Sequence, residues 1–563
     1  MEFLDARRLT GPNLLSDGPG AILDVRCSSE QVPGLVEAWE RAVSRMLDAL
    51  GWQQERLTHK PLAGGVSLAF SAPIDALYAA TEVNEWVWSE IGPDGGNTDE
   101  TFEQAVDRIR ASIEEERRPA LLSLEAAART AEVPFLWDDD DVSVGYGRYS
   151  TCWPVDQLPE PQNVDWPEFQ SLPIGVVTGT NGKTTTVRMA SHIAGVAGRS
   201  VGVSCTDWIS VGGEVVDRGD WSGPGGARAV LRRSEVDFAI LETARGGLLR
   251  RGLGVERADA ALITNIAEDH LGDFGSSSLA ELLDIKWIVS RAVRQSGVLI
   301  LNADDELLVA KARDYDGELQ WFSLHPGNPL ITEHIAAGGC AWLLKDGWLQ
   351  RASADECDKL CAVQDMPVTL GGAARHNVAN ALAAAALTSA LGIPLSQIAT
   401  GLCSMQPADN PGRSNVHDVD GVTVLVDFAH NPHAMQAMFD LARAMPAKRC
   451  FLAFGQAGDR TDEQIRELAR GAWQIGLDEV IVSELRKYHR GREEGEVFGI
   501  IRGELESCGA KAESIHHVEE ELEALELALG RAAPGDLIIV LALAAGEAVN
   551  ERLVTLTGRR TPT

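Results

Sequence analysis

Residues 179–186 read Gly179-Thr180-Asn181-Gly182-Lys183-Thr184-Thr185-Thr186. The apolar run of residues 174–178 comes directly before them, and a stretch that favours helix, residues 187–197, comes directly after. This order predicts a strand, a glycine-rich turn and a helix. Such a turn, together with the helix N-terminus, aims backbone N–H groups at anionic oxygens. The sequence therefore predicts a phosphate-binding loop here.

The residue types in this loop suit a nucleotide phosphate. Gly179 and Gly182 allow the backbone to turn tightly, Lys183 adds a positive charge, and the Thr184 hydroxyl can bind Mg²⁺. Val177 stands where the general P-loop pattern has its first glycine, so the loop is a variant of that pattern. We expect residues 179–185 to contact the phosphates of a bound nucleotide.

Length and charge restrict the class of protein. The chain has 563 residues and a net charge of −33. The length predicts three or four domains, and the negative charge argues against a nucleic-acid partner, which needs clustered Lys and Arg. The cysteines are scattered singly, the start of the chain has no apolar signal segment, and the longest apolar stretch, residues 378–391, is too short to span a bilayer. We expect a cytoplasmic protein with no membrane partner; a homo-oligomer stays open.

Apolar strands alternate with helical stretches along most of the chain. The clearest expected strands are residues 174–178, 238–241, 261–265 and 298–302, followed by a second series at 422–427, 449–455, 479–484 and 537–543. Alternation of this kind predicts α/β domains with mostly parallel sheets. We therefore expect a multidomain α/β protein, with an α+β N-terminal domain and linker (1–165), a P-loop central domain (166–410) and a Rossmann-like C-terminal domain (411–563).

Polar residues follow two of the expected strands, where an open α/β sheet places its ligand-binding groups. Glu242 follows the strand at residues 238–241 and could hold Mg²⁺, and His270 lies in the segment after the next strand. Lys286 comes sixteen residues past His270. Each residue also has a role without catalysis as an alternative. Glu242 could cap a helix, His270 could be a structural histidine, and Lys286 could be an ordinary surface lysine.

Taken in this order after the loop, these residues resemble the Mur ligase superfamily, whose ATP-dependent members join a carboxylate to an amine. The likeness extends to four later motifs: Arg375-His376-Asn377-Val378-Ala379-Asn380-Ala381, Pro411-Gly412-Arg413, Asp427-Phe428-Ala429-His430-Asn431-Pro432 and Gly455-Gln456-Ala457-Gly458-Asp459-Arg460.

The resemblance implies ATP and Mg²⁺ as cofactors. It implies that Asn377 and Asn380 approach the base, that Asp427 approaches the ribose, and that Arg413 approaches the phosphates. It also implies catalytic roles for Lys183, Glu242, His270 and Lys286. By the same likeness, Thr184 and Glu242 hold one Mg²⁺, and His270 and a carbamylated Lys286 hold a second.

One branch of the superfamily, the ligase half of the cyanophycin synthetases, is the most similar. Asp220-Trp221-Ser222-Gly223-Pro224 and residues 242–250 look like that half, and Leu9-Thr10-Gly11-Pro12-Asn13 resembles the start of the same enzymes. Those enzymes carry an ATP-grasp domain between these regions, for which residues 101–165 leave no room. Gly145-Tyr146-Gly147 looks like a remnant of its entry segment.

The resemblance implies a small-molecule or peptide carboxylate substrate and an amino acid or amine as the second substrate. Arg228, Arg245 and Arg250 could clamp the carboxylate, because guanidinium groups match its geometry, and His430 is a further candidate substrate contact. Ion pairs within the protein are the alternative for the three arginines. Two other functions stay open: a nucleotide-binding accessory subunit of a separate ATP-grasp ligase, and a P-loop kinase or NTPase that forms no amide.

Overall fold

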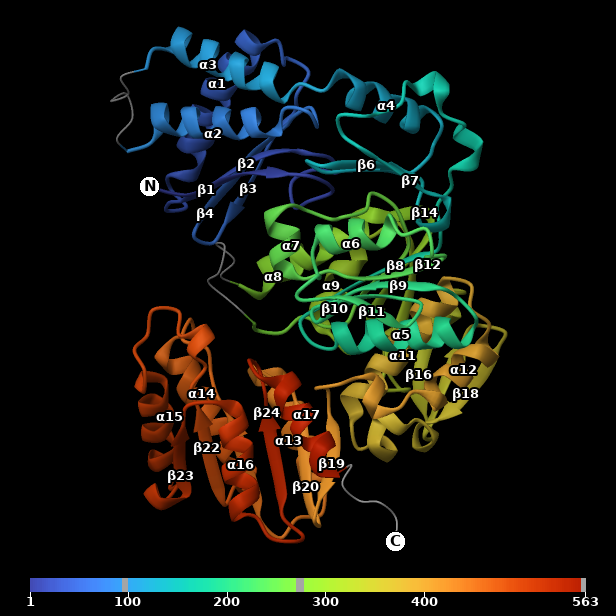
Figure 1. The fold of residues 1–563 in the computed structure, drawn as a ribbon, viewed down its shortest axis with the longest axis vertical. Helices are drawn as coiled ribbons and strands as arrows, with labels where there is room; N and C mark the ends of the chain where they lie inside the picture. Colours follow the sequence, from blue (N-terminus) through green and yellow to red (C-terminus); the bar gives the residue numbers. More distant parts are fainter. Residues whose placement is uncertain (94–99, 270–277, 558–563) are drawn as a thin grey trace.

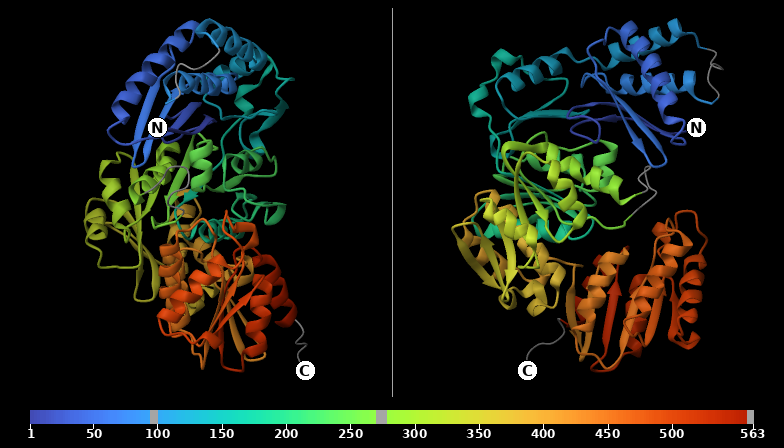
Figure 2. Two further views of the ribbon diagram at one scale, coloured as in Figure 1. Left: turned by 90° about the vertical axis from the view of Figure 1, so that its left-hand side faces the viewer. Right: turned by 180° about the vertical axis from the view of Figure 1, so that it is seen from behind.

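The computed structural model describes residues 1–93, 100–269 and 278–557 (Figure 1). An N-terminal layer of helices and strands lies at one end of the long axis, a large central sheet lies in the middle, and a C-terminal α/β unit lies at the other end (Figures 1 and 2). This is the multidomain α/β fold that the sequence predicts. The proposed domain limits themselves stay predictions.

The N-terminal unit is an antiparallel sheet covered on one face by helices. Its strands have the order β1-β2-β4-β3. They are β1 (Glu2–Leu9), β2 (Gly20–Arg26), β3 (Leu57–Leu62) and β4 (Gly65–Ser71). Helices α1 (Val32–Leu50), α2 (Leu77–Ile91) and α3 (Phe102–Glu116) cover the sheet. Trp39, Met46 and Phe70 lie fully buried in the core between them.

A small connecting unit links this layer to the central sheet. It consists of α4 (Pro119–Thr130) and the antiparallel strands β5 (Phe135–Trp137), β6 (Asp141–Val144) and β7 (Thr151–Pro154). Tyr146, in the Gly145-Tyr146-Gly147 segment, is buried, and Arg148 N donates to Val236 O of the central domain. This segment therefore joins the connecting unit to the central domain.

The central sheet has eleven strands in the described part of the chain, in the order β11-β10-β9-β12-β8-β13-β14-β15-β16-β17-β18. The strands from β9 to β16 in this order run parallel, and antiparallel strands close both edges. The parallel strands are β8 (Ile174–Thr178), β9 (Val201–Ser204), β12 (Phe238–Glu242), β13 (Ala258–Ile263), β14 (Val293–Asn302), β15 (Glu318–Ser323) and β16 (Cys340–Lys345). The edge strands are β10 (Trp208–Val211), β11 (Glu214–Arg218), β17 (Trp348–Ala352) and β18 (Cys357–Ala362).

Helices cover both faces of this sheet, which explains why its strands are nearly continuous apolar runs. One face packs against α5 (Lys183–Val196), α11 (Arg375–Ala390) and α12 (Leu395–Ser404). The other packs against α6 (Pro224–Leu231), α7 (Arg245–Arg250), α8 (Leu279–Trp287), α9 (Glu306–Lys311) and α10 (Pro329–Ala336). The apolar stretch at residues 378–391 belongs almost wholly to α11, and no helix in the described ranges is long and apolar enough to cross a membrane.

The C-terminal unit is a second, mostly parallel sheet with the order β19-β20-β24-β21-β22-β23. Its strands are β19 (Asn415–Val419), β20 (Val422–Asp427), β21 (Cys450–Phe454), β22 (Glu479–Ser483), β23 (Ile515–Val518) and β24 (Leu537–Leu541). Helices α13 (Pro432–Arg443), α14 (Asp462–Trp473) and α15 (Glu496–Ser507) cover one face, and α16 (Glu521–Arg531) and α17 (Gly546–Thr557) cover the other. This is the expected Rossmann-like arrangement.

Candidate active site

The backbone of the phosphate loop depends on its glycines. Gly179 and Gly182 have φ angles of +142° and +85°, which side-chain-bearing residues rarely adopt. A Cβ at Gly179 would lie 1.9 Å from Thr264 Oγ1, and one at Gly182 would lie 2.3 Å from Asn380 Oδ1. Both positions therefore exclude any side chain, as the sequence indicates.

The segment that follows β13 holds the loop in place. Thr180 N donates to Asn265 O (2.8 Å), and Asn181 N donates to Asn265 Oδ1 (3.0 Å). The Thr264 hydroxyl donates to Asn181 O at 2.6 Å. These bonds fix the backbone of the loop in the absence of a ligand.

The loop leads into α5, which begins at Lys183 and not at residue 187 as the sequence suggests. The N–H groups of residues 183–185 precede the first intrahelical bond, from Thr186 N to Gly182 O. Such N-terminal groups are free to bind an anion. Lys183 Nζ donates to Thr180 O at 2.9 Å, so its charge stays over the loop.

Glu242 ends β12 and is only 1% exposed. Thr206 holds both of its oxygens: the hydroxyl donates to Oε1 at 2.7 Å and the backbone N–H to Oε2 at 3.3 Å. Thr206 comes two residues after the end of β9 and was not among the residues predicted from the sequence. The strand-end signal that identified Glu242 would also have found it.

Lys286 lies in α8 and is buried, with Nζ donating to Gly179 O at 2.7 Å. Burial, with help from the nearby charges of Lys183 and Arg245, lowers its pKa well below the usual value, although Asp269 and Glu242 act in the opposite direction. Burial disfavours the charged form of a lysine, because the ammonium group loses its contact with water. This rules out the alternative of an ordinary surface lysine.

Asp269 ties this region to the C-terminal unit. Its carboxylate pairs with Arg460 at 2.9 Å and lies 3.6 Å from His430 Nε2. His430 Nδ1 also lies 3.1 Å from Phe428 O. His270, the next residue after Asp269, lies outside the described residues, so its predicted roles stay predictions.

The expected base and ribose contacts lie in α11 and at the end of β20, and Asn380 packs against the phosphate loop. Asn380 Nδ2 donates to Asn377 Oδ1 at 3.2 Å, and the Asn377 amide donates to Val368 O at 2.9 Å. Asp427 accepts from Ser414 N at 2.7 Å. These bonds orient three of the predicted nucleotide contacts before a ligand binds.

Arg413 sits in a cluster of charges between the central and C-terminal units. Its guanidinium lies 4.5 Å from the centre of the Phe428 ring and pairs with Asp207 at 3.2 Å. Asp207 also pairs with the buried Arg188, whose Nη1 donates to Asn410 Oδ1 at 3.1 Å. Asp207 and Arg188 did not appear among the sequence-based candidates, because their role depends on this contact between units.

One cleft of about 1040 Å³ joins most of these groups, a size suited to a nucleotide and a further small molecule. Glu242 and Arg188 are absent from its lining. The predicted residues that line it are Thr180, Asn181, Gly182, Lys183, Thr184, Thr185, Arg245, Lys286, Asn377, Asn380, Arg413, Asp427 and His430. Arg490 and Lys487, from the loop after β22, line its far wall.

Two predicted substrate contacts are absent from the lining of this cleft. Arg228 points to the connecting unit, where its Nε lies 3.5 Å from Asp138. Arg250 is the last residue of α7, more than a turn away from Arg245, which begins the helix and does line the cleft. The geometry therefore favours Arg245 as the carboxylate contact.

Two family profiles match the chain. The Mur ligase middle domain matches residues 177–388, and the Mur ligase glutamate ligase domain matches residues 412–543. The chain belongs to the Mur ligase family. The first profile covers the phosphate loop, Glu242, Lys286 and Asn380, and the second covers Arg413 and Asp427, so both walls of the cleft lie in Mur ligase domains.

Curated relatives agree with this assignment. The chain is 35% identical over 371 residues to cyanophycin synthetase of Geminocystis herdmanii, covering 66% of this Mur ligase and 42% of that protein. It is 33% identical over 399 residues to cyanophycin synthetase of Crocosphaera subtropica, covering 70% and 45%. The chain thus spans less than half the length of these relatives.

Solved structures show the same fold. E. coli FolC in complex with ADP, without folate substrate, matches with a TM-score of 0.51 and 19% identity, covering 68% of this chain and 89% of that one. The two profiles leave residues 1–176 unassigned.

Proposed function

We propose that this Mur ligase is an ATP-dependent ligase that forms an amide. A substrate carboxylate attacks the γ-phosphorus of ATP, which gives an acyl phosphate and ADP. An amine then attacks the acyl carbon, phosphate leaves, and the nitrogen loses a proton. The observation that carries the proposal is one cleft that is lined both by the phosphate loop with the buried Lys286 and by Asn380 and Asp427 of the later motifs.

The chain contributes position and charge to this reaction, and no side-chain nucleophile is needed. Lys183 lies over the loop and would offset negative charge on the transferring phosphoryl group. The helix N-terminus at residues 183–185 and the preorganised loop would bind the phosphates without rearranging. Groups fixed in this way stabilise a transition state at little reorganisation cost.

Mg²⁺ fits the residues beside the loop. Thr184 and Glu242 offer a hydroxyl and a carboxylate, which are oxygen ligands that Mg²⁺ prefers, and Thr206 already orients the carboxylate. Lys286 would join a metal site only after its neutral amine adds CO₂ and loses a proton to form a carbamate. Bound Mg²⁺ would supply further positive charge at the phosphoryl group.

Arg245 is the proposed contact for the substrate carboxylate. It lines the cleft, and its positive charge helps to lower the pKa of Lys286. It therefore lies on the side of the cleft where the acyl phosphate would form. His430, held near Asp269, would face the same space from the C-terminal unit. The second substrate is an amino acid or other amine, with arginine as the first candidate from the similarity to cyanophycin synthetases.

ADP release from the isolated chain tests the proposal. Single amino acids, arginine among them, are combined with aspartate-containing or short peptide carboxylates in the presence of ATP and Mg²⁺. Hydroxylamine is added in parallel, because an acyl phosphate yields a hydroxamate. We expect ADP that depends on the carboxylate, a hydroxamate with hydroxylamine, and an amide product with the correct amine.

Lys183→Ala should abolish turnover, whereas Lys345→Ala, at the exposed end of β16, should not. ADP release without hydroxamate would indicate a kinase or NTPase. Nucleotide binding without ADP release under any pairing would indicate an accessory subunit. Either outcome, or wild-type turnover by Lys183→Ala, would overturn the proposal.

A further inference from the structure

The N-terminal sheet rests on two helices of the central domain that carry cleft residues. Helix α7 begins with Arg245, and α8 contains Lys286 in its last turn. Both helices lie between the N-terminal sheet and the central sheet (Figure 1). On one side, Leu248 and Leu282 are buried in the central core. The other side meets β1 and the β3–β4 hairpin.

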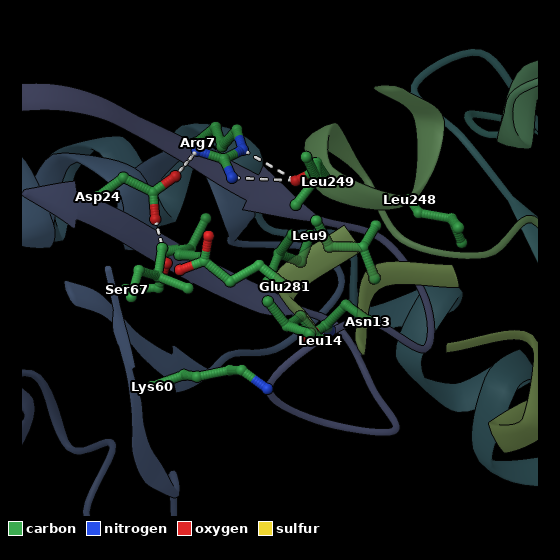
Figure 3. A pocket seen from close by; sticks show the side chains of 13 residues that line it. Arg7, Leu9, Asn13, Leu14, Asp24, Lys60, Ser67, Leu248, Leu249 and Glu281 are labelled. Carbon is green, nitrogen blue, oxygen red and sulfur yellow. Dashed lines mark hydrogen bonds and ion pairs between the residues drawn. The ribbon is translucent and has the colours of Figure 1, made fainter. Parts of the chain in front are cut away.

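Arg7 of β1 holds the end of α7. Its side chain is 9% exposed, and Nε and Nη2 both donate to Leu249 O, at 3.1 and 3.0 Å. Asp24 Oδ2 accepts from Arg7 Nη1 at 2.5 Å, and Asp24 Oδ1 accepts from the Ser67 hydroxyl (Figure 3). Carbonyls in the last turn of a helix lack intrahelical partners and favour a cation, so Arg7 fixes this helix end.

The β3–β4 hairpin holds α8. Lys60 Nζ lies 2.6 Å from Asp284 Oδ2, and Ala63 N donates to Glu281 Oε1 at 2.6 Å. Glu281 also accepts from Ser278 N, at the N-terminus of the helix, at 3.2 Å. One hairpin thus contacts two successive turns of α8. Asp284 lies two residues before Lys286, the residue that bonds to the phosphate loop.

The interface between these parts is closely packed. The space bounded by Arg7, Asn13, Leu249, Glu281 and Ile285 measures about 20 Å³ (Figure 3), which is room for a single water molecule. No ligand fits there. The polar contacts across it therefore serve to position the two helices.

We propose that the N-terminal sheet, residues 1–71, is a brace for the ligase cleft. Lys60 acts through Asp284 to keep Lys286 directed at the Gly179 carbonyl, and Arg7 acts through Leu249 to keep α7, and so Arg245, facing the cleft. Lys60 and Arg7 are positioning residues and touch no substrate. The proposal rests on the proposed function and assigns a role to the part of the chain that neither family profile covers.

Two lysines that share one carboxylate supply a matched pair of variants. Lys60 of the N-terminal sheet and Lys311 of α9 both place Nζ 2.6 Å from Asp284. Their side chains are 29% and 36% exposed, so neither alanine variant removes buried core. Lys60→Ala removes the ion pair between the N-terminal sheet and Asp284, whereas Lys311→Ala removes an ion pair within the central domain.

We expect Lys60→Ala to lower kcat for ADP release about tenfold, the size of one lost charge-assisted hydrogen bond, with the Kd for ATP unchanged. Lys60→Arg should restore kcat, and Lys311→Ala should lower it less than about threefold, because the hairpin still holds α8. Equal losses in the two alanine variants, or a loss in ATP affinity alone, would overturn the brace.

Hydrogen exchange gives a readout that needs no turnover. Lys60→Ala should speed exchange of the amides in residues 279–287 more than Lys311→Ala does, while exchange in the C-terminal unit stays as in the wild type. Unchanged exchange in α8 would overturn the brace even if the wild type is an active ligase. A wild type that releases no ADP would refute the proposed function. The exchange rates of residues 279–287 would still test whether the N-terminal sheet holds α8.

Discussion

Replacing Gly182 by alanine tests the phosphate loop, and Gly198 supplies a matched control. The two glycines flank the same helix, α5, and have nearly the same φ angle, +85° and +81°. An alanine at either position is strained by about 1–2 kcal/mol in this left-handed region. Only the surroundings differ: a Cβ at Gly182 would lie 2.3 Å from Asn380 Oδ1, whereas a Cβ at Gly198 would meet nothing within 4 Å.

Moving the Asn380 side chain away from that Cβ would cost free energy. It is 7% exposed, its amide donates to Asn377, and its oxygen lies 3.5 Å from the Thr186 hydroxyl. Displacing a buried, hydrogen-bonded amide costs about 1–3 kcal/mol. Gly182→Ala should therefore lose about 2–5 kcal/mol of stability in total, and Gly198→Ala only the strain of about 1–2 kcal/mol.

The assay combines urea unfolding with titration of ADP by calorimetry. We expect Gly182→Ala to bind ADP at least about tenfold more weakly, equivalent to about 1.4 kcal/mol, because both the loop and Asn380 shift. Gly198→Ala should bind ADP as the wild type does. Equal stability losses and unchanged ADP affinity in both variants would refute the steric argument.

Three further predictions concern Lys286, the Asn181–Asn431 contact and Glu242. Lys286→Met should abolish ADP release yet stabilise the fold at pH 7 in bicarbonate-free buffer. The lowered pKa of Lys286 means that, at pH values between its folded and unfolded pKa, the unfolded chain binds a proton that the folded chain does not. Wild-type stability therefore rises with pH up to the ordinary lysine pKa of about 10.4, and the gap to the variant closes; parallel urea-unfolding curves from pH 7 to 10 would contradict this. Asn181 and Asn431 exchange amide hydrogen bonds between the phosphate loop and the C-terminal unit, at 3.2 and 2.9 Å. Each alanine variant should lower kcat/KM for ATP about tenfold, with a coupling of about 1–2 kcal/mol in the double variant; additive losses would show that the contact is incidental. Glu242→Gln should raise the Mg²⁺ concentration for half-maximal ADP release about tenfold, as expected when a charge-assisted contact is lost, and Thr206→Val should raise it less; an unchanged Mg²⁺ titration would remove Glu242 from the metal site.

Local features of the nucleotide end could be predicted from the sequence. The strand at residues 174–178 has the predicted bounds in the structure, and the two glycines of the loop have the positive φ angles that their type suggests. The strand predicted at residues 261–265 lies instead at Ala258–Ile263, which leaves Thr264 and Asn265 free to hold the loop. Strand and loop patterns are local, so a single sequence shows them well, except at element boundaries.

Contacts between distant segments could not be predicted in this way. The pairing of Asp207 with Arg188 and Arg413 depends on the contact between two units. Arg228 could equally bind a substrate or form an ion pair within the protein, and its partner Asp138 became known only from the structure. Lys60 and Asp284 are 224 residues apart, and Arg7 and Leu249 are 242 apart. No periodicity or spacing in the chain pairs them.

The sequence by itself predicted the strand, glycine-rich turn and helix around residues 174–197 and the two mostly parallel sheets, because these depend on residue types at short spacing. Its separate motifs carried the resemblance to the Mur ligases. Only the tertiary structure decided which charges reach the cleft, that Lys286 is buried against Gly179 O, and that the N-terminal sheet holds α7 and α8. Burial and pairing set the state of a charged side chain, and both arise only when segments hundreds of residues apart are brought together.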